Sequence, residues 1–232
     1  MLSWKSHKTL ENTLESYRKN GLLDMISERN IWFQEISDLD VNIASAYNFK
    51  IVGKSVNVGI GNGIFSLMQE SSAKYVLFLE NDWELICDKQ KTQSRLQSGI
   101  NLLERGDFDV IRYRHRINSG HPNYGFNLKG RELEQKSHLL ESLYFTIDPD
   151  IKFSKYITKI VEDGEYFYTT MSKYGNFTNN PTLYRREFYL NVVSPFVSEN
   201  FEPESKIQSW WENQEFKVAQ GEGLFTHNRL DR

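Results

Sequence analysis

The chain of 232 residues lacks the features that mark three broad classes of protein. Cys87 is its only cysteine, so it can form neither an internal disulfide framework nor a cysteine-based zinc site. No window approaches the roughly 20 consecutive apolar residues of a membrane-spanning helix, and the N-terminus is polar almost at once. Basic residues (28) do not outnumber acidic ones (31), so there is no basic stripe for non-specific nucleic-acid binding. We therefore expect a cytoplasmic protein with no membrane span.

The composition suits a globular protein with a sizeable core. The chain is 39% hydrophobic and contains five Trp, 12 Tyr and 15 Phe. It shows no internal repeat and no linker that would mark a second domain. We expect a single domain over residues 1–232 and make no prediction about the oligomeric state.

The first 90 residues alternate between strand-like and helix-like segments. Hydrophobic periodicity predicts helices over 8–20, 38–49 and 57–73, and strands over 30–36, 50–55 and 75–79. Asp38 or Asp40 is the expected N-cap of the second helix. This alternation is typical of βαβ units, which predict an α/β fold with a mostly parallel central sheet and helices on both faces.

The second half is less regular. A helix is expected over 91–107, a strand over 109–116 and a later helix over 204–216. The aromatic, β-prone segments 165–171 and 181–193 predict a smaller mixed β region. Residues 117–137, which follow the strand expected over 109–116, are predicted to form a long mobile loop, of the kind that often acts as a lid.

The segment AKYVLFLENDWELI (73–86) carries the strongest functional signal. Its apolar strand ends abruptly in Glu80, Asn81 and Asp82, and ligands of parallel sheets bind outside the carboxyl ends of the strands. Carboxylates held there can bind Mn²⁺ or Mg²⁺, which in turn can hold a diphosphate. The alternative is that these residues only end a strand and begin a turn.

Two further motifs are ambiguous. NVGIGNGIF (57–65) is rich in glycine but does not match the G-x-G-x-x-G/A fingerprint, which disfavours a nicotinamide cofactor. His227, in GEGLFTHNR, is either an ordinary hydrogen-bonded histidine or a ligand that completes a carboxylate site. An imidazole ligand would favour Mn²⁺ over Mg²⁺.

Acidic residues also gather at the start of the predicted C-terminal helix. They complement the helix dipole, and one of them is a candidate general base: Glu199, Glu202 or Glu204. GNFTNNPTLYRRE (175–187) offers polar side chains that suit sugar hydroxyls or phosphates but also line ordinary turns, namely Asn179, Asn180, Arg185 and Arg186.

Three stretches resemble the GT-A fold of nucleotide-sugar glycosyltransferases, and among these the family-2-like members. They are SWKSHKTLENTLESY after a first strand, NVGIGNGIFSLMQESSAKYVLFLEND up to the acidic turn, and GEGLFTHNR near the end. The usual Asp-any-Asp signature would here be Glu80-Asn81-Asp82. One feature departs from the family: only Met1 and Leu2 precede Ser3, so either the first strand is unusually short, or the nucleotide pocket is imperfect, or the sequence is a shortened form.

The resemblance implies a role for individual residues. Asp82 would be the direct metal ligand, Glu80 would contact metal-bound water or the ribose, and His227 would add to the metal. The other donor-binding positions would be Ser3, Trp4, Asn57 and Asn81. Glu204 would be the catalytic base, with Glu202 as the second choice.

The resemblance implies a metal-dependent, inverting glycosyltransferase of the hexosyltransferase type. Residues 1–90 would bind the nucleotide sugar, with a UDP-sugar favoured, and residues 91–232 would bind the hydroxyl acceptor on a glycan, a protein or a modified base. A nucleotidyltransferase is disfavoured, because SWKSHK after the first strand contains no glycine. A non-catalytic module derived from a transferase stays open.

Overall fold

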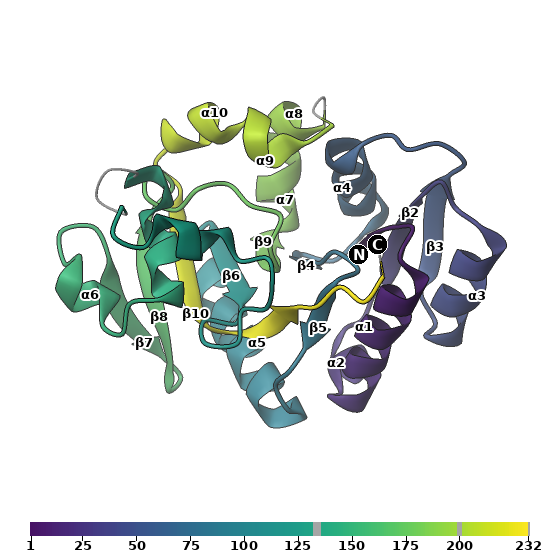
Figure 1. Ribbon diagram of the computed structural model, residues 1–232, viewed down its shortest axis with the longest axis horizontal. Helices are drawn as coiled ribbons and strands as arrows, with labels where there is room; N and C mark the ends of the chain where they lie inside the picture. Colours follow the sequence, from purple (N-terminus) through teal and green to yellow (C-terminus); the bar gives the residue numbers. More distant parts are fainter. Residues whose placement is uncertain (132–135, 199–200, 232) are drawn as a thin grey trace.

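A computed structural model describes residues 1–131, 136–198 and 201–231. The N-terminal part is a three-stranded parallel sheet made of β1 (Leu2–Trp4), β2 (Asn30–Gln34) and β3 (Lys50–Lys54), with β2 in the middle. Leu2 also forms a parallel bridge with Glu80, which lies just after β4 (Tyr75–Phe78). The two sheets therefore meet at β1 and β4 (Figure 1). The parallel arrangement predicted for the first strands is confirmed for β1, β2 and β3.

The second sheet is mixed and is the larger of the two. Its strands lie in the order β4-β9-β6-β10-β8-β7, and β5 pairs with the far end of β10. The new strands are β5 (Trp83–Leu85), β6 (Val110–Arg114), β7 (Thr158–Glu162), β8 (Glu165–Met171), β9 (Thr182–Arg185) and β10 (Lys217–His227). The α/β class, with a parallel N-terminal half and a mixed C-terminal half, is confirmed, but the mixed region that was expected to be smaller is the larger sheet, because β4 pairs with β9 and joins it.

Helices cover both faces of the sheets (Figure 1). One face carries α1 (His7–Lys19), α2 (Leu22–Met25), α3 (Asp38–Ala46) and α5 (Lys89–Glu104). The other carries α4 (Ile60–Glu70), η3 (Tyr189–Val193), α8 (Ser194–Val197) and α10 (Gln208–Glu212). Successive side chains of β2 point to opposite faces of the sheet, so Ile31 and Phe33 pack into the first core, under α1, α2, α3 and α5, and Trp32 packs into the second core, under α4, η3, α8 and α10.

The remaining short helices are η1 (Tyr124–Leu128), η2 (Lys136–Tyr144), α6 (Pro149–Lys152), α7 (Arg186–Phe188) and α9 (Pro203–Lys206). No helix in the described part of the chain has both the length and the apolar character needed to span a membrane.

Three local predictions need correction. The N-cap of α3 is Ser37, not Asp38 or Asp40: the Ser37 hydroxyl accepts from Asp40 N, and the Asp40 carboxylate accepts from Ser37 N at 2.9 Å. The strand expected over 181–193 ends at Arg185, and the chain continues in helical turns. The helical turns bring the Tyr189 ring against the Tyr184 ring, so the aromatic residues that favoured a strand there pack with one another instead. The helix expected over 204–216 is two short helices, α9 and α10.

Gly99 sets how closely α5 packs on the sheet. A Cβ at this position would lie 2.0 Å from the hydroxyl oxygen of Tyr113, which donates to Arg95 O at 3.0 Å. Alanine normally stabilises a helix interior by about 1 kcal/mol relative to glycine. We expect the reverse for Gly99→Ala, a loss of about 1–3 kcal/mol in the free energy of unfolding, because the clash must be relieved by shifting buried groups. Urea unfolding would measure it, with the exposed Gln90→Ala on the same helix as the control.

Candidate active site

The turn after β4 buries two of the predicted residues. Asn81 and Asp82 are 7% and 8% exposed, between β4 and β5. Asp82 Oδ1 and Asn81 Nδ2 have no hydrogen-bond partner among the described residues. Buried polar atoms are nearly always paired, so two unpaired ones in a single turn point to a ligand.

Strand β10 brings His227 to this turn. Its first residues pair with β6, an irregularity follows between Gln220 and Phe225, and the end of β10 pairs with β5 so that His227 lies opposite Trp83. His227 Nε2 is 3.1 Å from Asp82 Oδ2, and the imidazole ring packs edge-on against the Trp83 ring. Two residues 145 positions apart in the sequence thus form one site.

The contacts of His227 fix which ring nitrogen carries hydrogen. Nδ1 contacts the carbonyl oxygen of His121, which can only accept, so Nδ1 donates. In the neutral ring Nε2 then presents a lone pair to the Asp82 carboxylate. Either a proton or a cation must lie between these two acceptors, and a histidine that donates its other N–H to a carbonyl is the usual arrangement of a metal ligand.

The spacing of the pair also fits a divalent cation. Two ligands at right angles around an octahedral cation, with bonds of about 2.1 Å, lie about 3 Å apart. Among the residues that the structure describes, no group of three or more His, Cys, Asp or Glu side chains is placed to hold a metal ion. Asp82 and His227 would therefore supply two ligands, and the rest would come from substrate and water.

Glu80 directly precedes the turn that contains Asn81 and Asp82. It is partly buried at the bridge to Leu2, where β1 meets β4. Burial raises the pKa of Glu80 well above its usual range, and the nearby charges of Asp82 and Glu204 raise it further. Glu80, Asp82 and Glu204 therefore share one acidic region, although they come from distant parts of the sequence.

The ends of β1 and β2 form a second group. Ser3 is buried, while Trp4 is 45% exposed and its indole N–H donates to Glu35 Oε2 at 2.7 Å. Lys5 Nζ lies 2.8 Å from the same carboxylate and above the Trp4 ring, and these contacts lower the pKa of Glu35. Lys5 and Glu35 both have positive φ, at 42° and 54°, which is a strained backbone for such residues and is common in ligand clamps.

Sequence reasoning missed Glu35. Its signal was available, since Glu35 follows the carboxyl end of β2 just as Glu80 follows that of β4. Nothing local, however, distinguishes it from the acidic residues that begin the next helix.

The loop before α4 is fixed by Asn57 within it and by Gln34 at the end of β2. Asn57 Oδ1 accepts from Gly59 N at 2.8 Å, and the Gln34 side chain bonds both Val58 N and Gly59 O. Gly59 has a φ of 85°, and a Cβ there would lie 2.8 Å from the Phe201 ring. The glycine therefore permits a sharp entry into the helix, and the Asn57 oxygen is already engaged in the loop.

The structure separates the three candidate bases. Glu204, in α9, is exposed but anchored, since Oε1 accepts from Thr178 Oγ1 at 2.8 Å and from Asn179 N at 2.5 Å. Glu202 is exposed at the N-cap position of α9. Glu199 lies outside the described residues. Of the two candidates that the structure describes, Glu204 combines defined side-chain contacts with proximity to the acidic turn.

The other polar residues of 175–187 divide into two sets. Arg185, at the end of β9, donates to Leu103 O and Phe108 O, and Arg186, at the start of α7, donates to Met68 O, so both arginines make contacts with neighbouring elements. Asn179 is buried beside Glu204, and its side-chain oxygen has no partner among the described residues. The prediction of ligand binding thus stays open for Asn179, whereas the arginines have structural contacts.

Part of the predicted lid touches the site. Ser119 O accepts from His227 N at 3.2 Å, and Arg114 donates to Ser119 O and Pro122 O. Residues 132–135 lie outside the described residues. The role of 117–137 as a lid stays a prediction.

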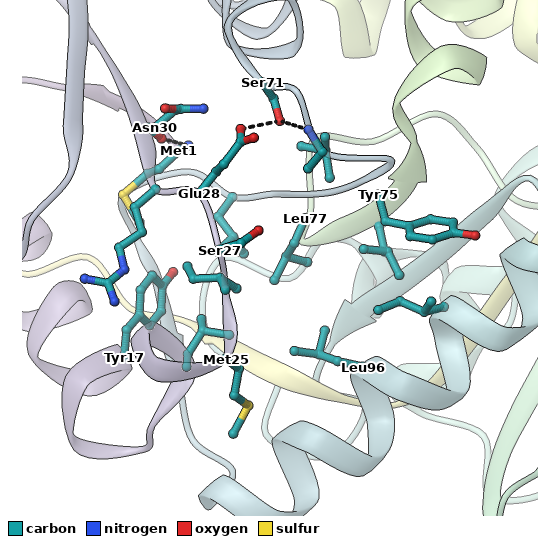
Figure 2. Close-up of a pocket in the computed structure, with 18 of the residues that line it drawn as sticks. Met1, Tyr17, Met25, Ser27, Glu28, Asn30, Ser71, Tyr75, Leu77 and Leu96 are labelled. Carbon is teal, nitrogen blue, oxygen red and sulfur yellow. Dashed lines mark hydrogen bonds between the residues drawn. The ribbon is translucent and has the colours of Figure 1, made fainter.

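A cavity of about 730 Å³ lies elsewhere, between α2, the start of β4 and α5. Figure 2 shows Met25, Leu77 and Leu96 bordering it, with Glu28 hydrogen-bonded to Ser71 at its rim. Its lining includes Asn30 and Tyr75, which begin β2 and β4. It extends from Tyr75, at the start of β4, to Leu79, just after its end, and neither Asp82 nor His227 lines it.

A scan against models of protein families finds no match, and neither does a search of curated proteins. Solved structures do match. The chain aligns over 98% of its length with S. aureus TarS, at a TM-score of 0.60 and 14% identity, and spans 36% of that chain; it spans 59% of a TarS 1–349 structure, at a TM-score of 0.56 and 14% identity.

Two further matches contain ligands. Mannosyltransferase PcManGT from Pyrobaculum calidifontis, in complex with GDP-Man and Mn²⁺, matches 94% of the chain and 56% of its own, at a TM-score of 0.55 and 9% identity. Glucosyl-3-phosphoglycerate synthase from Mycobacterium tuberculosis, in complex with Mn²⁺, UDP-Glc and phosphoglyceric acid, matches 100% of the chain and 72% of its own, at a TM-score of 0.50 and 11% identity. The chain thus has the GT-A fold of nucleotide-sugar glycosyltransferases, as the sequence predicted. At these identities the likeness shows the fold alone.

Proposed function

We propose that this protein is a metal-dependent glycosyltransferase that moves a sugar from a nucleotide-sugar donor to a hydroxyl acceptor with inversion at the anomeric carbon. The observation that carries the proposal is the Asp82–His227 pair at the carboxyl end of β4, with the buried Oδ1 of Asp82 unpaired. This edge of the sheet is where parallel α/β folds bind their ligands.

Asp82 and His227 would hold Mn²⁺ or Mg²⁺, and the imidazole nitrogen favours Mn²⁺. When bound, such a cation neutralises the charge that develops on the leaving diphosphate. Glu80 would contact water or ribose. The Mn²⁺ present in the PcManGT complex supports the use of a divalent metal on this fold.

The nucleotide would lie across the ends of β1 and β2. Trp4 offers an exposed aromatic face, and Ser3, Asn57 and Asn81 border the same edge of the sheet. Glu35 joins this set through its contact with Trp4. We favour a UDP-sugar, although the matched structures contain both UDP-Glc and GDP-Man. Residues 1–90 would thus form the donor half.

Glu204 would remove the proton from the attacking hydroxyl of the acceptor. Its contacts with Thr178 and Asn179 hold one carboxylate oxygen, which leaves the other free to face the acceptor. The acceptor would bind to residues 91–232, and the segment 117–137 would limit water access to the donor. Attack by a hydroxyl on the face opposite the diphosphate inverts the anomeric carbon.

The proposal is tested by calorimetric titration of UDP, GDP, CDP and ADP, with and without Mn²⁺. We expect one of these nucleotides to bind tightly and only with the metal. The matching nucleoside monophosphate is the control and should bind more weakly, because it lacks the β-phosphate that would reach the metal. If no nucleotide binds under either condition, the proposed function is wrong.

A further inference from the structure

The segment after β10, residues 228–231, which we term the tail, links the acidic turn to α1. Asn228 N donates to Asp82 O at 2.8 Å, and its side-chain amide donates to Glu84 Oε2 at 2.8 Å. The tail then crosses to the start of α1, so that the end of the chain lies beside its beginning (Figure 1). One end of the tail is thus attached to the candidate metal site.

The other end of the tail caps α1. The Ser6 side chain, at the N-cap position, makes no capping hydrogen bond, and the first turn of α1 contains no acidic residue. The Asp231 carboxylate instead accepts from Lys8 N at 3.0 Å and from Thr9 N at 3.1 Å. A carboxylate at this position satisfies free helix N–H groups and favours the helix dipole.

Thr9 reinforces this attachment from a fully buried position. Its hydroxyl donates to Asp231 Oδ1 and lies 2.9 Å from Leu230 N, which donates to it. Asp231 and Thr9 are 222 positions apart in the sequence, so these contacts join two distant segments of the chain rather than stabilise a local turn.

Two residues of functional interest lie at or within the attached segment. His227 immediately precedes the tail, and Arg229 lies within it, where its guanidinium donates to Ser6 Oγ at 3.3 Å. Arg229 is the cation of the tail that lies close to Glu80. If the far end of the tail were released, Arg229 would lose its fixed position beside Ser6, whereas His227 would still be held by the pairing of β10 with β5 and by its contact with Ser119.

We propose that Asp231 is a positioning residue, whose contacts with α1 hold the tail and thereby place Arg229 at the donor site. This inference rests on the proposed function of the Asp82–His227 pair. Apparent affinity falls in proportion to the fraction of molecules in the binding-competent arrangement. A tail ordered for one tenth of the time would therefore weaken donor binding about tenfold.

The test compares Asp231→Ala and Thr9→Val with wild type by calorimetric titration of the nucleoside diphosphate that wild type binds, in the presence of Mn²⁺. Asp88→Ala is the matched control. Asp88 caps the N-terminus of α5 by accepting from Lys91 N at 2.9 Å, and it has no contact with the tail among the described residues. Thermal unfolding without nucleotide is measured for all variants.

We expect all three variants to unfold at a lower temperature, because each loses helix-terminus contacts, but only Asp231→Ala and Thr9→Val to bind the nucleotide about tenfold more weakly. Equal nucleotide affinity in wild type and Asp231→Ala would overturn the positioning role while leaving the proposed function intact. Absence of nucleotide binding in wild type would instead overturn both. Should Asp231→Ala not fold, Thr9→Val decides.

Discussion

Replacing Asp82 by alanine is expected to lower the rate of sugar transfer by about 100-fold or more and to remove metal-dependent nucleotide binding. Asp82 supplies the only carboxylate that contacts His227 within the described structure, at 3.1 Å. Stabilisation of diphosphate charge by a bound cation contributes several kcal/mol, and each 1.4 kcal/mol is a factor of ten in rate. Donor hydrolysis and transfer in the presence of Mn²⁺ would measure the loss.

The chain contains a matched control for this change. Asp40 is also buried and also forms an Asp–His pair, with His7 Nε2 at 3.1 Å from Asp40 Oδ1, but it lies at the start of α3 and belongs to a capping box. Asp40→Ala should therefore reduce stability by about 1 kcal/mol and leave metal-dependent nucleotide binding unchanged. Equal losses in both variants would show that the Asp82 effect is one of folding.

The same experiment addresses the non-catalytic alternative. A module that retained only binding would lose metal-dependent nucleotide affinity in Asp82→Ala, yet the wild-type protein would neither transfer nor hydrolyse the donor. Turnover by wild type that disappears in Asp82→Ala would identify an enzyme. The two measurements, affinity and turnover, therefore have to be made on the same pair of proteins.

The N-terminal half of the fold was predictable because its signals are local. Each strand from β2 to β4 is a short apolar run, and each following helix shows its own periodicity. The acidic turn was predictable for the same reason, since the place where a buried strand ends can be read from YVLFLEND alone. Local sequence patterns are enough to predict a feature when residues close to it in the sequence determine its structure.

Other features depend on contacts that no local pattern records. The strand expected over 181–193 stops at Arg185, because its aromatic residues pack in the second core rather than extend β9. Glu35 matters through Trp4 and Lys5, which belong to a different strand end. The cap of α1 by Asp231 joins the two ends of the chain. Each of these requires the strand order of the sheets, which the sequence did not specify.

Local sequence also does not distinguish between the acidic residues near the C-terminus. Glu202 and Glu204 have equivalent local settings, on either side of Pro203. They differ because Thr178 and Asn179, 26 and 25 positions away from Glu204, bring their donors to its carboxylate. The preference for Glu204 that the family resemblance suggested thus gains a physical basis, and its catalytic role stays a proposal.

Glu204→Gln is expected to lower kcat for transfer by about 10²–10⁴-fold, the usual contribution of a general base, with little change in donor affinity. Glutamine keeps an oxygen that can accept from Thr178 Oγ1 and Asn179 N, so the loop should remain in place. What it removes is the basic oxygen for the acceptor proton. Initial rates at saturating donor, together with calorimetric donor affinity, would separate these two effects.

Glu202→Gln is the control for this change and should retain nearly full activity, since Glu202 is exposed and lies at the N-cap of α9. A large loss in Glu202→Gln with activity retained in Glu204→Gln would exchange the two roles. The configuration of the product, measured by NMR of the anomeric proton, provides an independent check. A base that activates the acceptor for direct displacement requires an inverted product, so a retained configuration would contradict the role of Glu204 even if its substitution abolished activity.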